Sequence, residues 1–257
     1  GEKLRLALDV DQRMWAQSER MVDANVRYLD LAGRKLFVNN EGIRIITDEI
    51  RTYLVLYASA QEAGIISPSM EAVGGTIGFE IFRESDPIEL AVLVAKRAVE
   101  LLKADVPKGG LVTSVLDNKL LALLVHEAFG HAAEADLVLS GGALTGKIGQ
   151  QVGSELVTIV DGPEPRGNNG WIPYDDEGVK AKAVNIVHNG ILKNYMHNRE
   201  SARIFQTEPT GNARAQDYTY PPIIRMRNTY MEPRNWSPEE IIRDTKEGYY
   251  LKGGLGG

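Results

Sequence analysis

The sequence predicts an α+β protein in two units, and three features of the 257-residue chain carry this prediction. Strand-like runs gather ahead of a helix in each half, whereas a parallel sheet would need strands that alternate with helices. Asn/Gly turns at 39–42 and 189–190 each separate two β-rich runs and indicate antiparallel hairpins. Pro107–Gly110 is the expected linker. We therefore expect an N-terminal α/β unit (1–107), with a meander and a helix, and a mainly antiparallel β domain (108–257).

The N-terminal unit is expected to contain a small antiparallel sheet between two helices. Apolar residues mixed with charges indicate the first helix, alternation of Tyr53, Val55 and Tyr57 indicates a strand, and Ser85 or Asp86 before Pro87 is a helix start. The expected elements in chain order are a helix within Val10–Leu29, a hairpin at Lys35–Ile46, strands at Arg51–Ala60 and Ile77–Phe82, and a helix at Ser85–Ala104.

The C-terminal unit is expected to carry one helix among antiparallel strands. Its strands are indicated by β-branched runs, and its helix by a leucine-rich stretch. The expected elements are a strand at Leu111–Leu116, a helix at Asn118–Ala135, a strand at Leu156–Val160 and a hairpin at Val184–Leu192 with a type I′ turn.

The composition narrows the classes of function. Hydrophobic residues make up 43% and charged residues 25%, which is typical of a globular chain. The net charge of −6 argues against a broad nucleic-acid-binding surface, and no apolar run reaches the roughly 20 residues that span a bilayer. The sequence has no Cys, so it holds no disulfide and no thiolate ligand. The first residues are charged and unlike a signal segment, and we expect a cytoplasmic protein.

The segment His126-Glu127-Ala128-Phe129-Gly130-His131 combines two imidazoles with a carboxylate, the groups that a hydrolytic metal site needs. The histidines are five residues apart, and in a regular α-helix five residues rotate by about 140°. A metal site therefore requires a local distortion such as a π-type turn, which Gly130 would make cheaper by tolerating unusual backbone angles.

Two other readings of this segment are open. Glu127 and His131, four residues apart, could form an exposed ion pair while His126 sits in the core. Alternatively, Glu127, His131 and Glu134 share one helical face and would suit a carboxylate-rich metal site. Spacing alone does not decide between these readings.

The run from His126 to Asp136 closely resembles the H-E-x-x-x-H signature of the TldD/PmbA family of metallopeptidases, and the TldD-type subunit in particular. The likeness covers Leu111–Gly248 almost continuously. It includes the blocks Asp175-Asp176-Glu177-Gly178, Asn189–Met196, Pro209–Arg214 and Arg225–Met231.

The resemblance implies that His126 and His131 ligate a zinc ion and that Glu127 is the general base. The family's third ligand is a Cys near its C-terminus, for which this chain has no counterpart. The chain is therefore expected to be a partial one, lacking the family's first α/β segment and its C-terminal end.

Three residues of one later block are candidates for substrate binding. Thr210, Asn212 and Arg214 could hold a peptide backbone or carboxylate, since Arg pairs well with planar carboxylates; the alternative is a structural turn. His188 and His197 lack ligand spacing and are expected to be structural, and Asp175-Asp176-Glu177 is expected to be a solvated loop.

The leading functional hypothesis is a zinc peptidase that cuts short or unfolded peptides. The resemblance implies an enclosed site in a homodimer or in a heterodimer with a PmbA/TldE-type subunit. The alternative is a non-catalytic subunit or interaction protein of the same fold without a complete metal site, which the missing Cys favours. The family's older label, a modulator of DNA gyrase, suggests nucleic acid, but the acidic charge argues against direct DNA contact.

Overall fold

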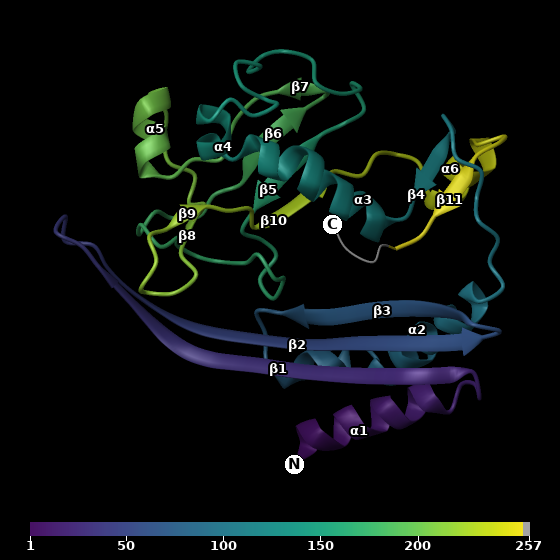
Figure 1. Cartoon of the computed structure of the whole chain (residues 1–257). Helices are drawn as coiled ribbons and strands as arrows, with labels where there is room; N and C mark the ends of the chain where they lie inside the picture. Colours follow the sequence, from purple (N-terminus) through teal and green to yellow (C-terminus); the bar gives the residue numbers. More distant parts are fainter. Residues whose placement is uncertain (254–257) are drawn as a thin grey trace. The chain divides into compact units, whose positions relative to one another are not determined.

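A computed structural model describes residues 1–253 and shows a mixed α+β protein, which confirms the predicted fold class (Figure 1). Contacts divide the chain into two units. The first comprises Gly1–Arg34 and Asp48–Gly110, and the second comprises Lys35–Thr47 and the chain from Leu111 onward. The division of the chain into two domains at 107/108 remains a prediction. No helix among the described residues is long and apolar enough to cross a membrane.

The first unit packs two helices on one face of a three-stranded sheet (Figure 1). In chain order the elements are α1 (Glu2–Trp15), β1 (Met21–Val38), β2 (Arg44–Glu62), β3 (Ile65–Gly75), a 3₁₀ turn (Phe79–Arg83) and α2 (Pro87–Leu101), with β2 at the centre of the sheet. Residues 35–38 of β1 and 44–47 of β2 belong to the second unit. Leu54, Leu56 and Ala58 alternate along β2 and are buried, because successive strand residues face opposite sides. The side chain of Asp86 caps α2, as predicted.

Of three expectations for this unit, one was confirmed in part and two were wrong. The first helix spans Glu2–Trp15 and so includes only the start of Val10–Leu29, whereas Met21–Leu29 lie in β1. Arg51–Ala60 is not a separate strand but the second half of β2. Ile77–Phe82 is no strand either, because Phe79 and Phe82, three residues apart, lie on one side of a 3₁₀ turn and contact the ring of Tyr28. The third strand is β3, which the sequence analysis missed.

The second unit is built around a four-stranded antiparallel sheet in the order β10-β5-β6-β7. Asn189 and Gly190 both have positive φ in the β6–β7 turn, as a type I′ turn requires. The elements are β4 (Ser114–Leu116), α3 (Asn118–Val125), a π turn (His126–Gly130), a 3₁₀ turn (His131–Ala133), α4 (Ala135–Leu139), β5 (Ile159–Gly162), β6 (Val184–His188), β7 (Ile191–Leu192), α5 (Arg199–Phe205), β8 (Ala213–Arg214), β9 (Ile223–Ile224), β10 (Asn228–Met231), α6 (Pro238–Asp244) and β11 (Tyr249–Leu251).

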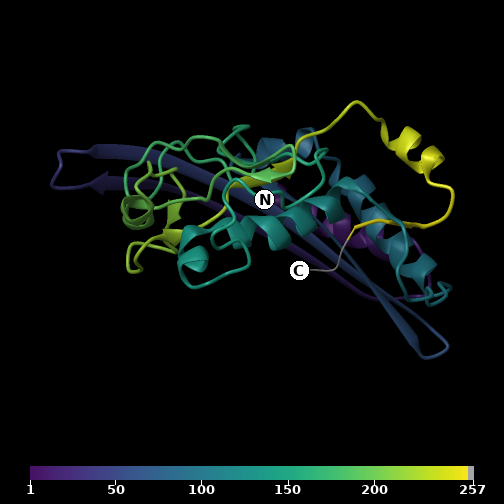
Figure 2. The ribbon, with the colours of Figure 1, turned by 90° about the horizontal axis from the view of Figure 1, so that it is seen from above.

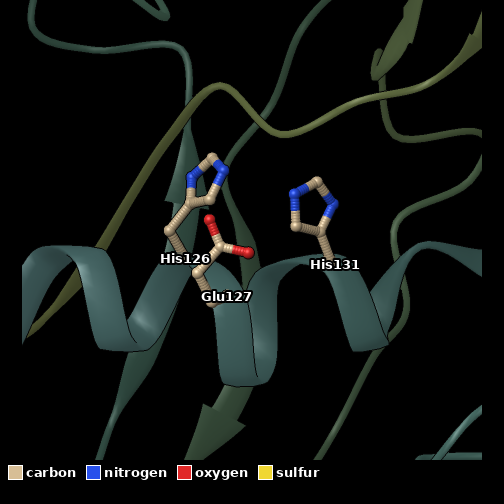
Figure 3. A group of neighbouring side chains, drawn as sticks. All are labelled: His126, Glu127 and His131. Carbon is tan, nitrogen blue, oxygen red and sulfur yellow. The ribbon is translucent and has the colours of Figure 1, made fainter. Parts of the chain in front are cut away.

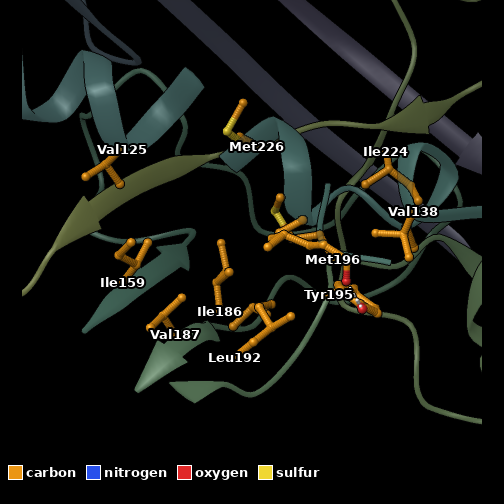
Figure 4. Close-up of a cluster of buried hydrophobic side chains, with 14 residues drawn as sticks. Val125, Val138, Ile159, Ile186, Val187, Leu192, Tyr195, Met196, Ile224 and Met226 are labelled. Atoms are coloured by element: carbon orange, nitrogen blue, oxygen red, sulfur yellow. Dashed lines mark hydrogen bonds between the residues drawn. The ribbon is translucent and has the colours of Figure 1, made fainter. Parts of the chain in front are cut away.

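A hydrophobic core joins this sheet to the helical run that begins with α3 (Figure 4). Ile159 and Ile186 come from the sheet, Val125 from the end of α3, and Met226 from the segment before β10; all are nearly or fully buried. Figures 1 and 2 show α3 and the turns after it as one continuing helical run. The core therefore holds the segment that carries both signature histidines against the sheet.

Candidate metal centre

The predicted distortion is present, as a π turn at the end of α3. The carboxylate of Asp117 caps α3 by accepting from the N–H of Leu120 at 2.8 Å. After the eight residues of α3 the helix widens, and the N–H of His131 bonds the carbonyl of His126, five residues back. Residues five apart thus come to one side of the helical run, which confirms the expectation that His126 and His131 face the same space.

The two imidazoles and the Glu127 carboxylate converge (Figure 3). The rings of His126 and His131 have centroids 4.9 Å apart and are nearly perpendicular, at 86°. One ligand atom from each of the three residues lies within 4.8 Å of the others. Figure 3 shows one nitrogen of each ring turned toward the other ring, with the carboxylate beside them.

Gly130 is needed for space rather than for backbone freedom. Its φ of −59° and ψ of −61° are helical and open to any residue, so the reason given for it in the sequence analysis was wrong. A Cβ at this position would lie 1.9 Å from the sulfur of Met226, a buried residue just before β10. The π turn thus packs its backbone directly against the chain that leads into the sheet edge.

Burial and neighbouring charges set the protonation of this cluster. Burial, and then the nearness of His131, lower the pKa of His126, so its imidazole is neutral at pH 7, the form that binds metals. Burial raises the pKa of Glu134, whereas its hydrogen bond with His131 acts in the opposite direction.

The predicted ion pair between Glu127 and His131 does not form. The carboxylate partner of His131 is Glu134, with 3.3 Å between Nδ1 and Oε2. The group of ligand atoms that lies together is His126, Glu127 and His131, rather than the alternative set with Glu134. The reason is local, because Glu134 leaves the helix with a ψ of 120° and no longer continues the helical face.

A pocket of about 870 Å³ opens beside the cluster, between α3 and β10. Both His126 and Glu127 line this pocket. Its lining residues are Ala122, Leu123, His126, Glu127, Glu164, Pro165, Asn168, Arg227, Asn228, Thr229 and Tyr230. The candidate centre therefore has space for a ligand next to its polar groups.

The structure does not bring the predicted substrate-binding residues to this pocket. Thr210 and Asn212 are buried and bond each other at 2.7 Å, and the Asn212 amide also donates to Asp161 and to the carbonyl of Arg225. Arg214 lies in the short strand β8 and is absent from the pocket lining. A direct substrate role for these three residues stays a prediction.

Asp175 of the acidic block and His197 are buried and make structural hydrogen bonds. The carboxylate of Asp175 is buried and accepts the N–H groups of Glu177, Val179 and Ala213, so it organises its own loop rather than being solvated. His197 is also buried, with Nδ1 3.1 Å from the hydroxyl of Ser201.

A buried ion pair that was not predicted from the sequence lies beside the pocket. Asp161 in β5 is fully buried and accepts from the Nε of Arg227 at 2.9 Å and from the hydroxyl of Thr229 at 2.8 Å. This pair ties β5 to the start of β10. The two residues are far apart in sequence, so no local pattern pointed to the contact.

Sequence models of two family domains match nearly the whole chain. The "PmbA/TldA metallopeptidase central domain" matches residues 1–104, and the "PmbA/TldA metallopeptidase C-terminal domain" matches residues 109–257.

Curated relatives and solved structures agree with this match. A metalloprotease of Methanocaldococcus jannaschii is 40% identical over 257 residues, covering 100% of this chain and 56% of that protein. A "Zinc metalloprotease TldD homolog" of Saccharolobus solfataricus is 35% identical over 91% of this chain and 52% of its own length. This chain thus spans about half the length of these relatives.

Among solved structures, a protein of Thermotoga maritima described as a modulator of a DNA gyrase superposes with a TM-score of 0.85 at 26% identity, covering 98% of this chain and 56% of that one. TldE from Thermococcus kodakarensis superposes with a TM-score of 0.70 over 99% of this chain and 57% of its own; at 17% identity it shows a shared fold.

Proposed function

The chain belongs to the TldD/PmbA family of metallopeptidases, and from its His126–Glu127–His131 cluster we propose that it forms part of a zinc-dependent peptidase. The carrying observation is the π turn, which puts both imidazoles on one side of the helical run with Glu127 beside them. Such turns are rare within helices and frequent at functional sites.

The residues present fit a zinc ion. Zn²⁺ prefers imidazole nitrogen, and burial keeps His126 in the neutral form that can donate a lone pair. His126 and His131 would hold the ion. The resemblance implies a Cys as a further ligand, and this chain contributes none. When bound, zinc would polarise the scissile carbonyl and acidify the attacking water.

Glu127 would act as the general base of this reaction. Its side chain is exposed toward the pocket, beside His126, where a water and a substrate carbonyl can meet. The carboxylate would take a proton from the attacking water and pass it to the leaving amine, which restores the ionised base.

The edge of the sheet supports a peptide as substrate. Within the described part of the chain, β10 pairs only with β5, so its other edge has no strand partner. The N–H of Glu232 bonds the carbonyl of Thr158 in the direction of β5, and by alternation Thr229 presents its N–H and carbonyl outward. Thr229 lines the pocket, so an extended peptide could pair there and pass Glu127.

The assembly and location of the protein belong to the same proposal. We expect a dimer, either of two copies or with a PmbA/TldE-type subunit, that acts on short or unfolded peptides in the cytoplasm. A non-catalytic role remains the alternative, because the sequence contains no Cys ligand.

Metal removal tests the proposal on the full-length protein. Chelation should abolish cleavage of a flexible fluorogenic peptide, and zinc added in slight excess should restore it. His126→Ala and His131→Ala should neither retain zinc nor regain activity, whereas His188→Ala, at an exposed hairpin position, should behave like the parent. Cleavage that survives complete removal of metal would refute a metallopeptidase.

A further inference from the structure

Glu134 is a buried carboxylate with no evident structural task. Its side chain is 4% exposed, and among the described residues its single hydrogen-bond partner is His131. The second carboxylate oxygen, Oε1, is buried and has no hydrogen-bond partner within residues 1–253. A carboxylate is costly to bury, and an apolar residue would fill the same space at lower cost. The position therefore calls for an explanation beyond packing.

Glu134 stands at the N-cap position of α4, but its side chain does not cap the helix. Glu134 is the residue before α4, where an acidic side chain would normally accept the first free N–H groups of the helix. Its side chain makes no such bond. It turns back to the ring of His131 instead, while its backbone bridges to Met196 and its N–H bonds the carbonyl of His131.

The contact determines which nitrogen of His131 is free. An ionised carboxylate can only accept, so in a bond to ionised Glu134 the hydrogen sits on Nδ1 of His131. A neutral imidazole has one N–H, which leaves the other nitrogen, Nε2, with an open lone pair. Figure 3 shows that one ring nitrogen of His131 faces His126 and Glu127 and the other faces away. Because Nδ1 is engaged with Glu134, Nε2 is the nitrogen that faces the cluster.

We propose that Glu134 is a positioning residue that holds His131 in the Nδ1–H tautomer and aims Nε2 at the metal position. This inference deepens the proposed function and rests on it. Outer carboxylates that orient a ligating imidazole also raise its basicity, and their loss typically weakens metal binding by about 10- to 100-fold. The π turn brings the two rings together, and Glu134 sets the direction of the second one.

The first test measures the zinc affinity of the full-length protein by competition with a chromogenic chelator. Glu134→Ala should weaken zinc binding by about 10- to 100-fold. Glu134→Gln keeps an acceptor oxygen of the same shape and should lose less. Asp136→Ala removes the carboxylate two residues later, which lies near Glu134 but makes no bond to His131, and should keep the parent affinity.

The second test needs neither metal nor activity. In the metal-free parent protein, ¹⁵N chemical shifts of His131 should report the Nδ1–H tautomer, and Glu134→Ala should shift the ring toward the Nε2–H form. If Glu134→Ala fails to fold, the parent spectrum and Glu134→Gln decide. An Nε2–H tautomer in the parent, or a Glu134→Ala protein with unchanged zinc affinity, would overturn the inference. A parent protein that binds no zinc would instead overturn the proposed function, and the tautomer would still be measurable.

Discussion

Gly130→Ala tests how the site is built, because the added methyl group has no room. The new Cβ would lie 1.9 Å from the sulfur of Met226, against a normal contact of about 3.5–4.0 Å. Met226 is 5% exposed and surrounded by core residues, so it cannot simply turn into solvent. Overpacking of this kind costs about 1–3 kcal/mol. Since Gly130 has helical backbone angles, the higher helix propensity of Ala would by itself raise the free energy of unfolding by about 1 kcal/mol.

A double-mutant cycle separates these two effects. Gly130→Ala alone should lower the free energy of unfolding by up to about 2 kcal/mol. It should also weaken zinc binding, because the clash with Met226 would displace the π turn that links the two histidines. In a Met226→Ala background the same change should be stabilising, which gives a coupling energy of about 1–3 kcal/mol. The assay is urea unfolding followed by tryptophan fluorescence in a Trp15→Phe background, which leaves Trp171 and Trp236 as probes of the second unit. Additivity within about 0.5 kcal/mol would refute the close packing.

Three further changes test other parts of the account. Asp161→Ala leaves Arg227 buried without its partner and should destabilise the second unit by about 3–5 kcal/mol in urea unfolding; a loss below about 1 kcal/mol would contradict a structural ion pair. Burial lowers the pKa of His197 from 6.5 to about 4, so on acidification the unfolded chain binds a proton at this residue before the folded chain does. The free energy of unfolding should therefore fall by no more than about 3 kcal/mol between pH 7 and 4, and His197→Gln should remove this contribution to its pH dependence. N-methylation of single amides along a peptide substrate should lower kcat/KM by about 2- to 10-fold where the amide would pair with Thr229, and a scan without any sensitive amide would exclude strand pairing.

The sequence predicted the site better than it predicted the N-terminal sheet. His126 and His131, five residues apart, cannot share a site in a regular helix, so the metal reading required a distortion, and the π turn supplies it. β3 was missed because Pro68 and the pair Gly74-Gly75 are typical turn residues. However, β3 is an edge strand of its sheet, and edge strands tolerate proline.

Other features depend on contacts that no local pattern encodes. The space over Gly130 depends on Met226, and the role of Asp161 depends on Arg227, each brought near by the fold. Glu134 was considered as a metal ligand because it continues the helical face, but the chain leaves the helix at that residue. Its bond to the far side of His131 could be found only from the structure.

The most direct test of the central claim is a paired measurement on full-length Glu127→Gln protein, zinc content together with the rate of peptide cleavage. The amide keeps the shape of the side chain but cannot accept the proton of the attacking water. Zinc content should match the parent, because both imidazoles are untouched, while kcat should fall by about 10²- to 10⁴-fold. Glu127→Gln protein that retains zinc and cleaves at the parental rate would contradict the account.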